Sequence, residues 1–328
     1  FYDPDLHGLD WRAVRDRYEP LLAHVGRRED LNFLLMEMIG EFQVGHNRVG
    51  GGDIHREDGP STGLLGADFV IENDRYRIAR IYSGERWNPF LRGPLAEPGL
   101  GVSAGDFILA IDGRELGAGD NIHALLQGTV DRQTTLTVAS DPRGRATRDI
   151  VVRPVGGDGA LRLWGWIEEN RAEVERATDG RVGYVYLPNT AGAGYDFFNR
   201  MYYAQADKQA IIFDERANGG GQAADYITDV LSPFHLAGWL GRGNQLPYNT
   251  PFAAHYGPKV MLIDQDAGSG GDFLPYSFRR RGIGPLIGTR TWGGLIGISA
   301  NPSLIDGGGL VVPFFRFYTP EGEWRVEN

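Results

Sequence analysis

The sequence of 328 residues has no cysteine and only two lysines, Lys208 and Lys259. Without cysteine the chain can form neither disulfides nor a thiol nucleophile. It also lacks any apolar run of about eighteen residues, so no membrane-spanning segment and no membrane partner are predicted. Its formal net charge of −10 disfavours nucleic acid as a partner, because such proteins present a basic surface. No HExxH or comparable cluster is present, so we expect no metal and no cofactor.

Glycine, in contrast, is abundant at 48 residues and gathers in three triplets, at 50–52, 219–221 and 307–309. Such clusters are typical of tight turns and of places where backbone approaches something closely. The chain begins at Phe1 rather than at a methionine. We therefore expect a piece of a longer protein, and a cytoplasmic location is predicted for it.

Three stretches of different character divide the chain. Residues 1–62 read as a helical segment, with apolar side chains at helical spacing from Leu31 to Phe42 and with Asp30 placed to cap that helix. Residues 63–157 hold short β-rich runs and one short helix near 122–127, which predicts a small β-rich domain. Residues 158–328 alternate strands (182–187, 210–214, 260–264 and a further one from 286) with helices (195–206, 223–231 and 272–281). That alternation predicts an α/β layer with a largely parallel sheet.

Two glycine-rich turns follow buried strands of the α/β region, at 214–221 and at 266–272. Ligands of such sheets bind at the carboxyl ends of the strands. Ser269 lies between glycines at the start of a helix, where free N–H groups favour developing negative charge. The N–H of Gly270 and one from the glycine triplet are candidate oxyanion donors. A helix-capping serine is the alternative interpretation of Ser269.

A nucleophilic serine needs a base. The chain has seven histidines, and position alone does not choose among them. His46 stands out because it follows a helix end and enters a glycine-rich loop. A Ser–Lys dyad is disfavoured, since no lysine follows Ser269 and Lys259 lies at the far end of the preceding strand.

Taken together, these segments resemble the C-terminal half of the tricorn peptidases, relatives of the C-terminal-processing serine proteases. The resemblance covers essentially the whole chain. Its motifs are YDPDLHG at 2–8, the His46 segment, DERANGGG at 214–221, AGSGGD at 267–272 and WRVEN at 324–328. It implies a crotonase/ClpP-like layered α/β fold with a PDZ-like domain, and a homo-oligomer, either a trimer or a hexamer.

The resemblance also implies roles for individual residues. Ser269 is the expected nucleophile, His46 the general base and Glu327 the acid that orients the base. The N–H groups of Gly220 and Gly270 form the expected oxyanion hole. In the PDZ-like domain, the loop of Leu64, Leu65 and Gly66 stands where such domains bind a peptide carboxylate; an architectural role for this domain is the equal alternative.

The chain departs from the family pattern in two places that bear on activity. Gly45 replaces the serine whose hydroxyl links base to acid, so Glu327 must reach His46 by another route. Residues 231–263 contain no Asp or Glu but several aromatic residues, which favours an apolar or aromatic preference over a basic one. The large β-propellers that precede this half in tricorn are absent from the sequence.

The predicted function is therefore a serine peptidase that cleaves short or unfolded peptides through an acyl-enzyme on Ser269. Two alternatives remain. A catalytically impaired homologue would keep the PDZ-like domain for peptide binding, and Gly45 is its main support. A crotonase-like acyl-coenzyme A enzyme would share the α/β architecture, although no sequence feature favours it.

Overall fold

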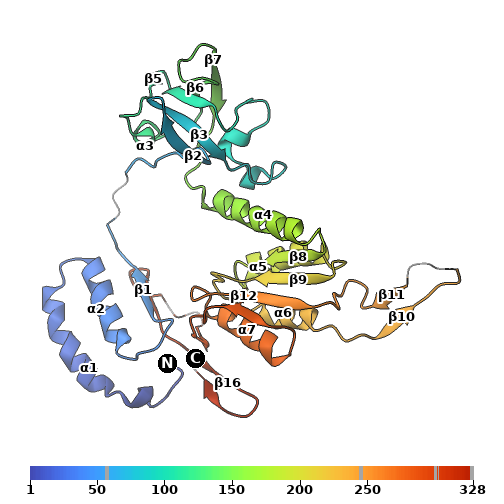
Figure 1. Ribbon diagram of the computed structural model, residues 1–328. Helices are drawn as coiled ribbons and strands as arrows, with labels where there is room; N and C mark the ends of the chain where they lie inside the picture. Colours follow the sequence, from blue (N-terminus) through green and yellow to red (C-terminus); the bar gives the residue numbers. More distant parts are fainter. Residues whose placement is uncertain (56–58, 244–246, 299–300, 302, 326–328) are drawn as a thin grey trace. The chain divides into compact units, whose positions relative to one another are not determined.

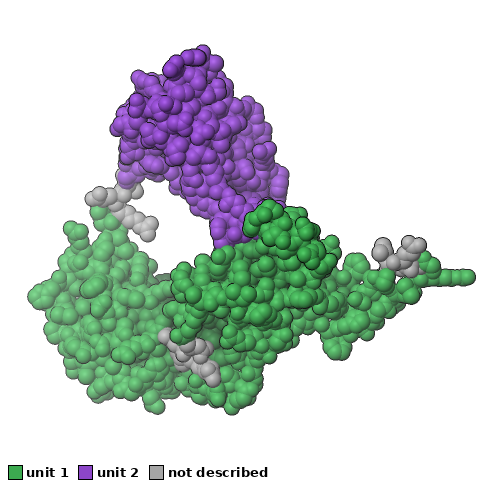
Figure 2. All heavy atoms as spheres, in the orientation of Figure 1, with its two compact units in different colours: residues 1–56, 173–328 green, residues 57–172 purple. Residues whose placement is uncertain are grey.

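The structure is a computed structural model that describes residues 1–55, 59–243, 247–298, 301 and 303–325. The chain forms two compact units, one of residues 1–56 and 173–328 and one of residues 57–172 (Figure 2). Among the described residues, no helix combines the length and the apolar character that crossing a membrane requires. Each unit is described separately below.

The unit of residues 57–172 is built on an antiparallel sheet. Its strands run in the order β2-β3-β4-β6-β7, with the short β5 paired to β4. Alternating side chains of these strands bury a core that includes Ile78, Ile108, Leu136 and Ile150, as expected for strands with one buried face. The elements are β2 (Ala67–Glu72), β3 (Arg75–Ile81), β4 (Phe107–Ile111), β5 (Arg114–Glu115), α3 (Ile122–Leu125), β6 (Thr134–Ala139) and β7 (Thr147–Val152).

A parallel sheet in the order β13-β12-β9-β8 forms the centre of the other unit. Its short strands are strongly apolar, as is typical of parallel strands that helices cover. Helices α6 and α7 pack against each other beside the sheet (Figure 1). The elements are β8 (Val182–Tyr186), α5 (Gly192–Tyr203), β9 (Ala210–Asp214), α6 (Ala224–Leu231), β12 (Lys259–Ile263), α7 (Gly270–Arg280) and β13 (Leu286–Gly288).

The N-terminal helices belong to this same unit. Helices α1 (Trp11–Tyr18) and α2 (Arg28–Gly40) precede β1 (Arg48–Gly51), which pairs antiparallel with β15 (Gly308–Val311). This pairing forms a separate two-stranded sheet that joins the N-terminal part of the chain to its C-terminal part, and His46 lies in the loop just before β1. The remaining strands of this region are β14 (Ile296–Gly297), β16 (Phe315–Tyr318) and β17 (Trp324–Arg325), in the order β14-β16-β17.

An apolar arm extends from the same unit (Figure 1). Its strands β10 (Ala237–Trp239) and β11 (Tyr248–Thr250) pair antiparallel, and Trp239 stacks on Tyr248 with ring centroids 6.1 Å apart. Large apolar side chains remain exposed along it, among them Phe234 (79%), Leu240 (74%) and Phe252 (80%).

The predicted fold class, an α/β region with a small β-rich domain and an N-terminal helical segment, is confirmed. Several details differ. The predicted cap Asp30 lies inside α2, where its carboxylate accepts from the N–H groups of Gly26 and Arg27 at 3.1 and 2.9 Å. The long helix α4 (Gly159–Ala177), the arm and the strands after β13 were not predicted. The strands of the arm and those after β13 are too short to show a clear alternation of apolar and polar residues.

Candidate active site

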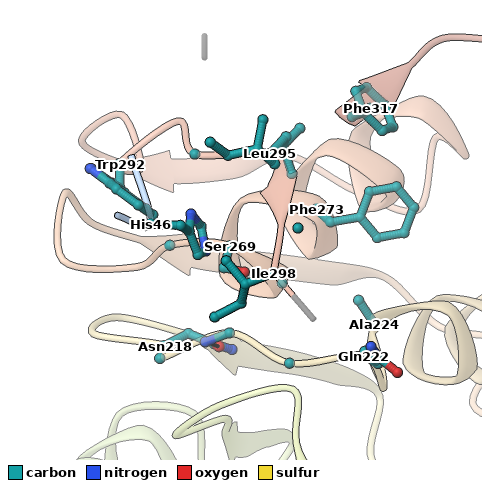
Figure 3. Close-up of a pocket in the computed structure, with 18 of the residues that line it drawn as sticks. His46, Asn218, Gln222, Ala224, Ser269, Phe273, Trp292, Leu295, Ile298 and Phe317 are labelled. Atoms are coloured by element: carbon teal, nitrogen blue, oxygen red, sulfur yellow. Dashed lines mark hydrogen bonds between the residues drawn. The ribbon is translucent and has the colours of Figure 1, made fainter. Parts of the chain in front are cut away.

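The His46 segment and the two glycine-rich turns meet in one pocket of about 850 Å³. His46 comes from the loop before β1, residues 218–221 from the turn after β9, and Ser269 from the start of α7; all of them line the pocket. Figure 3 shows the side chains of His46 and Ser269 directed into the same space, with Asn218 beneath them. The fold thus joins a candidate base and a candidate nucleophile that lie far apart in the sequence.

Two residues that line this pocket, His46 and Ser269, and Ala217, which precedes the lining residue Asn218, have positive φ angles. The φ angles are 66° at His46, 58° at Ala217 and 60° at Ser269. None of these residues is glycine, and such conformations cost free energy that the surrounding structure must offset. Strain of this kind gathers at functional sites, and at Ser269 it turns the chain sharply between β12 and α7.

The glycines around Ser269 are required by close packing. A Cβ on Gly220 would lie 2.7 Å from Cβ of Ser269, and a Cβ on Gly270 would lie 2.1 Å from Oγ1 of Thr190 and 2.2 Å from the carbonyl oxygen of Gly221. The two glycine-rich turns are therefore packed backbone against backbone. This places the peptide groups of residues 220–221 beside the nucleophile turn.

The two predicted oxyanion donors differ in their surroundings. The N–H of Gly220 donates to Oδ1 of Asn218 at 2.9 Å, so it is already engaged within its own turn. The N–H of Gly270 lies at the start of α7, where helix geometry leaves the first donors without intrahelical acceptors.

Asp272 holds the nucleophile turn together. Its Oδ2 accepts from the N–H groups of Ser269 at 2.6 Å and Gly294 at 3.0 Å, and its Oδ1 accepts from the N–H of Gly293 at 2.6 Å. The side chain is almost fully buried. We did not predict this role, although the Ser-x-x-Asp spacing at a helix start is a capping signal.

Trp292 positions the candidate base. The ring of His46, which is 8% exposed, packs on Trp292 with centroids 4.9 Å apart. Trp292 in turn donates its backbone N–H to the carbonyl of Ala267 at 2.9 Å, which ties it to the nucleophile loop. Sequence reasoning missed this residue because its segment carries no recognisable secondary-structure pattern.

A buried acid lies behind the site. Glu215 is fully buried, and within the described residues neither carboxylate oxygen has a hydrogen-bond partner. Burial, reinforced by the charges of Asp272, Asp264 and Asp214, raises the pKa of the Glu215 carboxyl well above 4.5. The neutral form is therefore favoured in the folded protein.

Of the other predicted site residues, Glu327 lies outside the described residues. The loop of Leu64, Leu65 and Gly66 belongs to the other unit, where it hydrogen-bonds and packs against residues of that unit. Leu64 exchanges backbone hydrogen bonds with Val155 at 2.8 and 2.9 Å, and Leu65 is buried in the core. Peptide binding at this loop stays a prediction.

Family comparisons agree along the chain. A tricorn protease C1 domain model matches residues 1–40, a tricorn protease PDZ domain model residues 63–157, and the peptidase family S41 model residues 181–328. The chain is 35% identical over 330 residues to tricorn protease homolog 1 of Streptomyces coelicolor, covering all of this chain and 31% of that protein.

Other relatives give the same picture. The chain is 33% identical over 317 residues to the tricorn protease of Thermoplasma volcanium, covering 96% of this chain and 30% of that protein. A crystal structure of the tricorn protease superposes with a TM-score of 0.87 at 30% identity, over 94% of this chain and 30% of that one. The chain thus spans less than a third of the length of these relatives.

Proposed function

The chain belongs to the tricorn protease family, whose catalytic domain is of peptidase family S41, and from that premise we propose that it is a serine peptidase that cleaves short or unfolded peptides through Ser269. The observation that carries the proposal is the meeting of Ser269, His46 and the 218–221 turn in one pocket. The S41 match over residues 181–328 favours this function over acyl-coenzyme A chemistry.

In the proposed mechanism His46 takes the proton of the Ser269 hydroxyl as its oxygen attacks the peptide carbonyl. The tetrahedral intermediate expels the amine, to which His46 returns the proton, and water then cleaves the acyl-enzyme by the same steps. Trp292 restricts the imidazole by ring contact, and Asp272 holds the backbone of Ser269. Both contacts reduce the reorganisation needed at the moment of reaction.

Negative charge on the carbonyl oxygen needs preorganised donors. We assign the N–H of Gly270, at the positive end of α7, and the N–H of Gly220. The second donor serves only when its hydrogen bond to Asn218 is exchanged for one to the oxyanion. Glu327 is the proposed acid that orients His46.

The same proposal includes assembly of several copies into a trimer or hexamer. The apolar arm, with Phe234, Leu240 and Phe252 exposed, supports it, because large exposed apolar patches mark interaction surfaces. A cytoplasmic location stays a prediction.

The decisive experiment combines a fluorophosphonate probe with peptide turnover. The full-length protein should be labelled at Ser269, and Ser269→Ala should lose labelling while peptide cleavage falls by about 10⁴- to 10⁶-fold. Ser277, a serine of α7 whose hydroxyl hydrogen-bonds the carbonyl of Leu274, gives the matched control Ser277→Ala, which should keep labelling. Unchanged turnover in a folded Ser269→Ala protein would sink the proposal.

A further inference from the structure

Two arginines line the same pocket as Ser269 and His46. Arg48 opens β1 two residues after His46, and the pairing of Arg48 with Val311 fixes its place. Arg316 lies on β16 opposite Ile296 of β14. Each of the two arginines is therefore held at the pocket wall by the pairing of its own strand, β1 for Arg48 and β16 for Arg316.

Neither arginine forms a salt bridge with the described part of the chain. Other arginines of this acidic protein commonly form ion pairs, as Arg28 does with Asp306 and Arg162 with Asp158. Arg48 forms no salt bridge or side-chain hydrogen bond with a described residue. Arg316 stacks over Trp324 at 3.9 Å and Tyr2 at 5.8 Å, and it interacts electrostatically with the carboxylate of Asp3 without forming a salt bridge in the described part of the chain.

The two carboxylates that also line the pocket, Asp225 and Asp266, do not pair with these arginines. Within the described residues, Asp266 accepts only from Gln265, at 3.3 Å, and Asp225 forms no salt bridge. Among the described residues Arg48 is thus without an ion-pair partner, and Arg316 interacts, among charged groups, only with the nearby Asp3, so a ligand carboxylate can reach Arg48 first.

We propose that Arg48, assisted by Arg316, binds a carboxylate of the peptide substrate; this inference rests on the peptidase function proposed above. A guanidinium presents a planar fork of donors that matches a carboxylate in two parallel hydrogen bonds. The carboxylate is either an Asp or Glu side chain near the cut or the terminal carboxylate of a short peptide. Arg48 is then a specificity-determining residue that the predicted apolar preference did not include.

Aromatic side chains of the pocket complement this role. Trp292, Phe273 and Phe317 line the cavity together with Leu295, so the pocket offers both apolar surface and two cations. The expected substrate combines an apolar residue at the cut with a carboxylate near it. Such a peptide would gain from both features at once, whereas a basic peptide would meet like charge at Arg48.

The test uses two pairs of matched fluorogenic peptides on the full-length protein. In the first pair, one peptide carries Glu at the positions flanking the cut and its partner carries Gln there. In the second pair, one peptide ends in a free carboxylate and its partner ends in an amide. A charge-assisted hydrogen bond of typical strength predicts a preference of roughly 10- to 100-fold in kcat/KM for the carboxylate form. A preference in the first pair identifies a side chain, and one in the second pair identifies the chain terminus.

Variants then assign the preference to Arg48. Arg48→Gln should reduce the ratio to near one, Arg48→Lys should keep part of it, and Arg48→Glu should favour Lys-containing peptides. Arg290→Gln is the matched control, because Arg290 is exposed and outside the pocket lining; its ratio should equal that of the parent protein. A ratio near one in the parent, or an undiminished ratio in Arg48→Gln, overturns the inference.

Binding separates this inference from the catalytic proposal. Ser269→Ala protein, titrated with the same peptides carrying a fluorescent label, should bind the carboxylate forms roughly 10- to 100-fold more tightly. Equal affinities there overturn carboxylate recognition whether or not the parent protein cleaves peptides. Tight, selective binding without any cleavage or probe labelling by the parent would instead refute the peptidase function alone.

Discussion

Glu215 gives the sharpest test of the energetics behind the active site. Its carboxyl follows β9, is fully buried and has no hydrogen-bond partner among the described residues. In the unfolded chain the group titrates near 4.5, whereas burial and three neighbouring aspartates raise its pKa in the folded protein. Folding therefore favours the protonated carboxyl at pH values just above 4.5, where the unfolded chain releases the proton.

The sign and size of the effect follow from linkage. Above pH 4.5 the unfolded state gains stability by losing the proton, so the free energy of unfolding falls as pH rises. The loss is at most about 1.4 kcal/mol per pH unit, over the range in which the folded form stays protonated and the unfolded form is ionised. Even one such unit is a sizeable share of the roughly 5–15 kcal/mol that stabilises a typical domain.

Glu215→Gln removes the ionisation and keeps the shape of the side chain. We expect the free energy of unfolding of the variant, measured by urea denaturation from about pH 5 to 7, to gain on the parent as pH rises, by at most about 1.4 kcal/mol per unit. The slope is independent of any constant cost of burying the amide. Glu29→Gln, an exposed change in α2, should leave the slope unaltered. Parallel curves for Glu215→Gln and the parent would refute the reasoning.

Two further predictions concern the nucleophile turn and the arm. Gly270→Ala places a methyl group against Thr190 and Gly221, so we expect kcat/KM to fall by about 10² to 10³ because an oxyanion donor is displaced, and the free energy of unfolding to fall by about 1–3 kcal/mol. The control Gly192→Ala, whose Cβ meets open space, should retain the activity and the stability of the parent. A fully active Gly270→Ala protein would contradict the packing argument. The double change Trp239→Glu and Leu240→Glu places charge on the arm, so we expect the proposed oligomer to dissociate, as measured by sedimentation velocity. The control Phe90→Glu alters an exposed residue of the other unit and should leave the oligomer intact. An unchanged sedimentation coefficient in the double variant would exclude the arm as the interface.

Local pattern was sufficient for the parts of the fold with strong periodicity. The buried strands β9 and β12 and the helices that follow them are evident because apolar runs and glycine-rich turns alternate there. The same signal marked both turns that line the pocket. It could not reveal the arm, since its short strands with exposed aromatic residues imitate no half-buried strand, and it did not mark α4.

What the sequence determined by itself is the set of parts: a serine in a glycine-rich turn, a glycine triplet, a histidine at a helix end, and the family to which they belong. Only the tertiary structure decided which parts meet. His46 and Arg48, at the start of β1, meet Ser269 in one pocket, and so does Trp292, which is tied to Ala267 and which no motif marked. The burial of Glu215, whose N–H donates to the carbonyl of Leu262, likewise depends on the pairing of β9 with β12. Such contacts join residues distant in the chain, and their energies depend on burial and neighbouring charge, which local sequence does not encode.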